Sequence, residues 1–215
     1  MVITFLKGVL TTTNLILIRH GETNWNSTQK CQGFSDTELN QTGRRQINEL
    51  AQSMKGDDIS AVYSSDLRRA KDTAVEIAKY HNLSINVDPD LREMNQGNLE
   101  GLSFAEIRGL YSELLAEWRR DPESVRIPGG ETLKEVQERA WKCVQRIIKT
   151  HHNQNVVAVS HNFTIITLLC KFKGVGLREF FNFKIKAASK NVVSIKRGGF
   201  KIDIQNDTTH LSHQS

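Results

Sequence analysis

Short apolar runs alternate along the chain with stretches in which apolar residues recur every three or four positions. The runs at 15–18 and 156–159 hold consecutive aliphatic residues, which is typical of strands buried on both faces of a parallel sheet. A further strand is predicted at 59–65. Helical spacing predicts helices at 39–55, from Asp66 onward, at 103–120 as one helix or two, from Glu131 or Thr132 to His151, and from 162 through Leu169. This order of elements predicts an α/β domain.

Local signals predict where several of these elements begin and end. Asn40 or Thr42 is expected to cap the helix at 39–55, with Gly56 as its stop. A short strand is predicted at 84–87, and 191–197 and 200–205 alternate as a closing hairpin with glycines in its turn. The polar segment 24–36 is predicted to be a loop.

Two of the apolar runs end in a histidine. His20 follows 15–18 in the sequence LILIRHGET, and His161 follows 155–160 in NVVAVSH. In open α/β sheets, ligands bind beyond the carboxyl ends of the strands. A single histidine there is more often a structural residue, but two such histidines from distant parts of the chain can meet at one edge of one sheet. The pattern therefore predicts a site containing both.

Composition limits the classes of partner. The chain has 215 residues, 38% hydrophobic and 25% charged, which fits one soluble globular domain. Its net charge of +5 is spread along the chain without a basic stripe, which favours an anionic substrate weakly and argues against a nucleic-acid surface. No run approaches the length needed to span a bilayer, and neither a P-loop nor a zinc spacing occurs.

The three cysteines and the first residues bear on the compartment. Cys31, Cys143 and Cys170 are odd in number and lack CxxC spacing, which is typical of free thiols in a reducing cytosol. The apolar segment 1–13 contains Lys7, and it fits a weak signal peptide less well than a packed extra strand or an extension upstream of the start site. We therefore expect a cytoplasmic protein.

The stretch LIRHGETNWN resembles the signature of the histidine phosphatase superfamily, which includes the cofactor-dependent phosphoglycerate mutases and many phosphatases. The resemblance implies a three-layer α/β/α sandwich with a mostly parallel central sheet. It implies an N-terminal extension at 1–13, a histidine phosphatase domain at 14–206 and a C-terminal tail at 207–215. A homodimer is common in the family. Neither a membrane nor a nucleic acid is an expected partner.

The resemblance also assigns roles to residues. His20 is the expected nucleophile, and SSDLRRA and LREMNQG are similar to the motifs that supply a phosphate-binding arginine and a proton donor. Arg68 is the exposed neighbour of that arginine. The expected catalytic residues are His20, Glu93, Arg19, Arg69 and His161, and the expected phosphate-binding residues are Arg19, Asn26, Gln32, Gly33, Arg69, His161 and Asn162.

Three further features of the sequence concern the surroundings of the predicted site. Most relatives have glycine after the second histidine, and Asn162 here puts in doubt the close amide contact that glycine allows. The stretch from 103 to the IPGGE turn, which includes Arg119, Arg120 and Arg126, is expected to lie over the pocket and select the substrate. His210 lies in the polar tail, without an expected role unless the tail folds back onto the pocket.

The implied mechanism is phosphoryl transfer. His20 attacks phosphorus, Glu93 protonates the leaving oxygen, and Arg19, Arg69 and His161 surround the equatorial oxygens, so neither metal nor cofactor is expected. The short segment between Glu93 and His161, together with Gln32, favours a phosphatase of a small phosphorylated metabolite, such as phosphoserine or α-ribazole phosphate, over a mutase. The alternatives are a cofactor-dependent phosphoglycerate mutase and a catalytically silent binding member.

Overall fold

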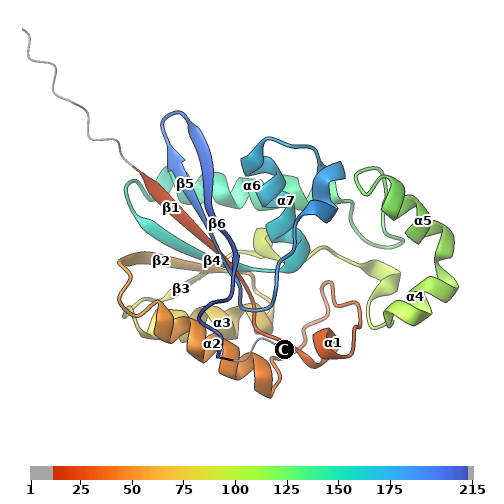
Figure 1. The fold of residues 1–215 in the computed structure, drawn as a ribbon, viewed down its shortest axis with the longest axis horizontal. Coiled ribbons are helices and arrows are strands. Elements are labelled where there is room, and N and C mark those ends of the chain that lie inside the picture. The colour runs from red at the N-terminus through yellow and green to blue at the C-terminus, as the bar shows by residue number, and fades with distance from the viewer. Residues whose placement is uncertain (1–11, 213–215) are drawn as a thin grey trace, which may run out of the picture.

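The computed structural model describes residues 12–212, and within them six strands form one sheet in the order β3-β2-β4-β1-β5-β6 (Figure 1). Strands β1, β2, β3 and β4 are parallel, whereas β5 pairs antiparallel with β1, and β6 pairs antiparallel with β5 at the edge of the sheet. The strands are β1 (Thr13–Arg19), β2 (Ile59–Ser64), β3 (Ile85–Val87), β4 (Asn155–Ser160), β5 (Lys190–Lys196) and β6 (Gly199–Asp207). The predicted strands and closing hairpin are confirmed.

Helices cover both faces of the sheet, with α2 and α3 on one side and α6 and α7 on the other (Figure 1). The α-helices are α1 (Asn24–Ser27), α2 (Gln41–Ser53), α3 (Arg68–Lys79), α4 (Phe104–Leu110), α5 (Ser112–Arg120), α6 (Leu133–Thr150) and α7 (Asn162–Lys173). Short 3₁₀ helices lie at η1 (Pro89–Leu91), η2 (Gly97–Leu99) and η3 (Leu177–Asn182). The expected three-layer α/β/α sandwich is confirmed.

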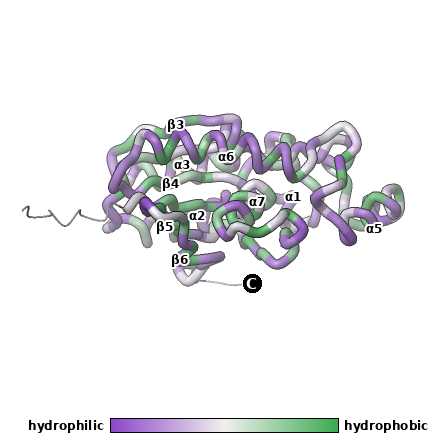
Figure 2. The backbone as a smooth tube through the Cα atoms, turned by 90° about the horizontal axis from the view of Figure 1, so that it is seen from above, coloured by the Kyte–Doolittle hydropathy of each residue, from purple (hydrophilic) through white to green (hydrophobic). Residues whose placement is uncertain are grey.

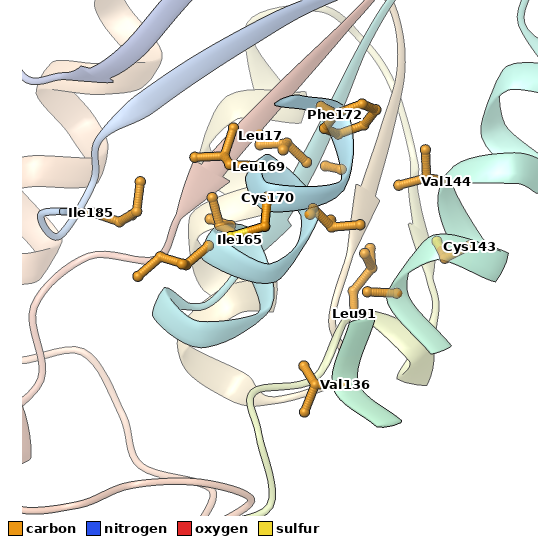
Figure 3. Close-up of a cluster of buried hydrophobic side chains, with 14 of the residues drawn as sticks. Leu17, Leu91, Val136, Cys143, Val144, Ile165, Leu169, Cys170, Phe172 and Ile185 are labelled. Atoms are coloured by element: carbon orange, nitrogen blue, oxygen red, sulfur yellow. The ribbon is translucent and has the colours of Figure 1, made fainter. Parts of the chain in front are cut away.

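The central strand β1 explains why its sequence does not alternate. Leu15 and Leu17 pack into the hydrophobic cluster under α6 and α7, whereas Ile16 and Ile18 pack into the cluster under α2 and α3. Figure 3 shows Leu17 among side chains of α7, including Leu169. Because both faces of the strand are covered, both sets of side chains have to be apolar.

Several boundaries differ from the prediction. Asn24–Ser27 forms a short helix inside the segment predicted to be a loop, because the Thr23 side chain caps it. Asp66 does not open α3; its carboxylate pairs instead with Arg92, whose Nε donates to it over 2.7 Å. Asn40, not Thr42, caps α2 by accepting a hydrogen bond from Gly43. Helix α2 ends at Ser53, three positions before the glycine expected to stop it.

Helices α4 and α5 lie beside the main body. Figure 2 shows α5 at the end of the molecule opposite the start of β1. The predicted segment 103–120 is thus two helices, and Ser103 caps the first with its side chain. None of the residues of α5 is fully buried. This pair therefore forms a flap at the carboxyl ends of the parallel strands, where the sequence placed a site.

The C-terminal tail folds back onto the body as far as the structure follows it. Leu211 packs against the cluster under α2 and α3, and His210 Nε2 lies 3.1 Å from the carbonyl oxygen of Ala188. The Ala188 amide in turn donates to the carbonyl of His20 over 3.1 Å. At the other terminus, Thr13 begins β1, and the interpretations of segment 1–11 fall outside the described residues.

None of the helices within residues 12–212 is both long and apolar enough to cross a membrane.

Close packing of α2 against the turn after β1 predicts a stability effect. A Cβ on Gly43 would lie 2.1 Å from the carbonyl oxygen of Glu22, so Gly43→Ala forces α2 and the turn apart. We expect a loss of about 1–3 kcal/mol in the free energy of unfolding, measured by urea denaturation. Gly56→Ala is the control, because a Cβ there meets nothing within 4 Å. Equal stability of the two variants would contradict this packing.

Candidate active site

The parallel pairing of β1 with β4 brings the two predicted histidines together. The register pairs Arg19 with Ser160, so the residue after each strand is a histidine at the same level of the sheet. The amide of His20 donates to the carbonyl of Ser160 over 3.1 Å, and the ring centroids of His20 and His161 are 5.0 Å apart. Both side chains are almost completely buried. The predicted meeting of these histidines is therefore a property of the fold.

His20 is held in the tautomer that a nucleophile needs. Its Nδ1 lies 2.7 Å from the carbonyl oxygen of Gly21, and a carbonyl only accepts hydrogen bonds, so the proton is on Nδ1. Nε2 makes no hydrogen bond to any described residue and keeps its lone pair. Burial, then the nearby charges of Arg69 and Arg19, lower the pKa of His20 well below its ordinary value. The imidazole is therefore neutral at neutral pH.

Two arginines are anchored beside His20 by backbone carbonyls. The buried guanidinium of Arg69 donates to the carbonyls of Ser35 and Gly33 over 2.7 and 2.8 Å. Arg19 Nη1 donates to the carbonyl of Ile185 over 2.6 Å, while its Nη2 makes no hydrogen bond to the described part of the chain. Burial lowers the pKa of Arg69 to about 10, which leaves it charged at neutral pH. Positive charge thus faces the site without a compensating ion pair among residues 12–212.

Glu93 is a buried carboxyl group of the site, held by backbone amides. Its Oε1 accepts from the amides of Met94, Phe163 and Thr164 at 2.9, 3.1 and 3.3 Å, and only 9% of the residue is exposed. Burial raises the pKa of Glu93 and outweighs the lowering by the amides and by Arg69 and Arg19. A carboxyl group in this position holds its proton at a higher pH than an exposed glutamate does.

The residues that follow His161 bring two backbone amides to Glu93. Asn162 is the first residue of α7, and the next two amides of that helix are the ones that reach Glu93. The Asn162 side chain lines the cavity. His161 does not line the cavity, and both of its ring nitrogens are buried without a hydrogen-bond partner in the described chain. It therefore backs His20 from within the protein.

The segment after α1 supplies polar groups to the same cavity. The side-chain oxygen of Asn26 accepts from the backbone amide of Thr23 over 3.1 Å, and that of Gln32 accepts from Thr37 Oγ1 over 2.7 Å. This leaves the NH₂ end of each amide as a donor for a ligand. Gly33 has a φ of 53°, and a Cβ on it would lie 2.0 Å from a Glu100 carboxylate oxygen. All three predicted residues line the cavity.

Two residues that hold the site together had no predicted role. Glu100 accepts from the amides of Phe34 and Ser35, both at 2.7 Å, and so fixes the segment that anchors Arg69. Arg139 on α6 donates to the carbonyls of Arg92 and Glu93, both at 2.7 Å. Their partners lie 46 to 66 positions away, so helical periodicity and short motifs carried no signal for them.

Arg19, His20, Arg69 and Glu93 converge on a cavity of about 200 Å³, which residues of α4 and α5 cover on the outer side. A second cavity of about 400 Å³ shares Arg19, Asn26, Lys30 and Phe104 with it, but neither His20 nor Glu93 lines that one. The smaller cavity is therefore the candidate active site.

Arg68 pairs with Glu38 at the surface, as expected for the neighbour of Arg69. Nowhere in the described range do three His, Cys, Asp or Glu side chains gather as metal ligands could.

The comparison with protein-family models matches residues 15–208 to the histidine phosphatase superfamily (branch 1). The chain belongs to this superfamily. Phosphoserine phosphatase 1 of Hydrogenobacter thermophilus is 34% identical over 92% of this chain and 93% of its own length. Phosphoglycerate mutase-like protein 4 of Arabidopsis thaliana is 36% identical over 92% and 86%. The solved structure of Bacillus stearothermophilus YhfR superposes with a TM-score of 0.88 at 30% identity, covering 92% of this chain and 98% of that one.

Membership of the superfamily agrees with the expected fold. The matched range includes every strand after the first residues of β1 and all the residues assigned to the site from the sequence.

The buried histidines predict how stability depends on pH. The pKa of His161 in the folded protein is lowered by burial and by Arg69, so folding favours its neutral form. Its contribution is complete above about pH 6.5 and is lost as the pH falls below that value toward the folded pKa. We expect the free energy of unfolding to fall over this acid range, and His161→Gln to reduce the slope by up to about 1.4 kcal/mol per pH unit.

Urea denaturation at a series of pH values measures this slope. His152→Gln is the control, because His152 is exposed at the far end of β4 from the site. If His161→Gln and the unaltered protein lose stability equally per pH unit, His161 is not buried in its neutral form.

Proposed function

We propose that this member of the superfamily is a metal-independent phosphomonoesterase that forms a phosphohistidine on His20. The observation that carries the proposal is the hydrogen bond from His20 Nδ1 to Gly21, which leaves a neutral Nε2 free at the cavity between two charged guanidinium groups. Nε2 attacks phosphorus, a P–N bond forms, and the bond to the leaving oxygen breaks. Glu93 transfers its proton to that oxygen, and the substrate leaves as an alcohol.

Hydrolysis of the intermediate reverses the proton transfer. Glu93, now a carboxylate, takes a proton from a water molecule that attacks phosphorus, and the P–N bond breaks. Inorganic phosphate leaves, with His20 neutral and Glu93 protonated again. The pKa values favour this cycle, because burial holds His20 neutral and helps Glu93 keep its proton.

Positive charge for the transition state comes from the protein itself. Arg19 and Arg69 lie on the cavity, and each guanidinium presents planar N–H groups that match phosphoryl oxygens. Asn26 and Gln32 add side-chain amides, and Gly33 and Asn162 also line the cavity. These donors are fixed before the substrate arrives, which is the arrangement that lowers a barrier electrostatically.

A small phosphorylated metabolite is the substrate class that fits a cavity of about 200 Å³. The relative from Hydrogenobacter thermophilus is named as a phosphoserine phosphatase, which makes phosphoserine one compound to test. The free cysteines, of which Cys143 and Cys170 are buried, support a reducing cytoplasm as its compartment. A homodimer stays an expectation from the family.

A phosphoglycerate mutase is the second candidate, because one relative is named as mutase-like. The two reactions differ in what accepts the phosphoryl group from His20. The short stretch between Glu93 and His161, together with Gln32 beside the phosphate, favours water as the acceptor. Incubation with 3-phosphoglycerate and 2,3-bisphosphoglycerate separates the two: interconversion without phosphate release means a mutase.

Replacing the nucleophile tests the covalent step. We expect His20→Ala to lower phosphate release from p-nitrophenyl phosphate by at least about a thousandfold, because no other described side chain presents a free nitrogen lone pair to the cavity. Quenching the unaltered protein in alkaline detergent after mixing with substrate radiolabelled in its phosphoryl group should trap an alkali-stable phosphoprotein that is lost on acid treatment and is absent from the variant. His152→Ala is the control and should keep both. Full activity of His20→Ala would refute the assignment.

Glu93→Gln tests the proton donor. Alkyl phosphates need a proton on the leaving oxygen, whereas p-nitrophenolate leaves without one. We therefore expect kcat/KM for an alkyl phosphate to fall by about 10²–10⁴, with a much smaller loss for p-nitrophenyl phosphate. Glu117→Gln, at an exposed position on α5, is the control. Equal losses on both substrates would mean that Glu93 is not the acid.

Glu93→Gln also tests how kcat/KM for an alkyl phosphate depends on pH. Glu93 has to be protonated to donate, so kcat/KM for an alkyl phosphate should fall as the pH rises through its raised pKa. Any decline that remains in Glu93→Gln belongs to another group.

A further inference from the structure

The cavity over His20 has two chemically different parts. Its floor carries the charged and amide groups of the proposed phosphate site. Its outer wall is built from Phe104, Ile107, Leu114, Leu115 and Trp118, which all come from α4 and α5. The wall therefore belongs to the flap that the sequence placed over the pocket, whereas the floor belongs to the sheet and its loops.

The wall is a fixed surface and not a loose end of the flap. The ring of Trp118 stacks on that of Phe163 with centroids 6.0 Å apart and an angle of 19° between the planes. Phe180 meets both rings edge-on, at 6.0 and 5.0 Å. Phe163 is the second residue of α7, beside the amides that hold Glu93. The aromatic group thus ties α5 to the end of the helix that carries the site.

The direction of the reaction places the leaving group against this wall. In an in-line displacement, the leaving oxygen lies on the side of phosphorus away from His20 Nε2, where the proton donor has to reach it. Glu93 lines the cavity that contains the wall and does not line the adjacent cavity. The group released with that oxygen therefore occupies the walled cavity. The more polar second cavity, with Glu22 and Lys186, lies away from the donor.

The wall gives few partners to a charged leaving group. Outside the proposed phosphate and catalytic groups, the lining residues with polar side chains are Lys30, Gln96 and Cys31, whose thiol is only a weak hydrogen-bond donor. Arg119 and Arg120, the nearest cations on α5, are exposed and do not line the cavity. The ammonium and carboxylate of an amino acid would have to give up water there without a matched pair of counter-charges.

From these observations, and resting on the proposed phosphatase function, we propose that the substrate is a monophosphate ester of an apolar alcohol, with its hydrocarbon part against the α4–α5 wall. Leu114, Leu115 and Trp118 set this specificity. The proposed function leaves the substrate open among small phosphorylated metabolites. An apolar monophosphate ester is a different class from phosphoserine.

A chain-length series tests this class without changing the chemistry. Ethyl, butyl and hexyl phosphate have leaving groups of similar basicity, so differences in kcat/KM report contact with the wall. Burying a methylene group favours transfer from water enough to expect a rise of about 2–4-fold for each one added. Phosphoserine is compared in the same assay, and we expect its kcat/KM to be at least about tenfold below that of hexyl phosphate.

Variants of the wall locate the effect. Leu114→Ala and Trp118→Ala should lower the ratio of kcat/KM for hexyl phosphate to that for ethyl phosphate, by about 3–10-fold. Arg119→Ala, next to Trp118 but exposed, should keep the ratio of the unaltered protein. Using a ratio within one variant removes any loss of folded protein, and Leu114→Ala leaves the aromatic stack in place if Trp118→Ala unfolds the flap.

The outcomes separate this inference from the proposed function. A flat chain-length series, a preference for phosphoserine, or wall variants with an unchanged ratio would overturn the apolar-substrate class while leaving a phosphatase. Absence of phosphate release from every ester, including p-nitrophenyl phosphate, would overturn the proposed function itself.

Discussion

The in-register parallel pairing of β1 with β4 is the constraint on which the site depends. It aligns Arg19 with Ser160 and so sets His20 beside His161 at the carboxyl ends of two central strands. A shift of one residue would turn every side chain of β1 to the other face, exchanging the sets that pack under α6–α7 and under α2–α3. Because both faces are covered, the hydrophobic core fixes the register, and the register fixes the position of His20, the proposed nucleophile.

Burial then sets the protonation states that the chemistry needs. Removing a charge from water is unfavourable, so the same dry environment holds His20 neutral and raises the pKa of Glu93. Arginine keeps its charge under these conditions, since even the lowered pKa of Arg69 is about 10. Backbone carbonyls take the place of water around Arg19 and Arg69, and amides of α7 do so around Glu93. A base, an acid and two cations thus coexist within one small volume.

How much of this site the sequence predicts depends on how far apart along the chain the two partners of each interaction lie. The strands, the helices and the meeting of His20 with His161 followed from local patterns and from the position of strand ends in an α/β sheet. Arg69 and Glu93 were assigned through their similarity to family motifs, and both line the cavity. The sequence assigned no role to Glu100 or Arg139, because the backbone groups to which they hydrogen-bond are distant in sequence. The sequence predicts a helix start at Asp66, and the prediction is wrong because the pairing of Asp66 with Arg92, 26 positions later, has no local signature.

The two parts of the cavity come from two different parts of the fold, the sheet with its adjoining segments and the α4–α5 flap. The groups proposed to act on phosphorus lie on or directly after β1, at the starts of α3 and α7, and on the segment that Glu100 and Arg139 bind, so their geometry is set by the core. The groups that meet the rest of the substrate sit on α4 and α5, where no residue of α5 is fully buried. Substitutions on that flap change what the cavity accepts at little expense to the core. The reaction is thus encoded in the part of the sequence that the fold constrains most, and the substrate in the part that it constrains least.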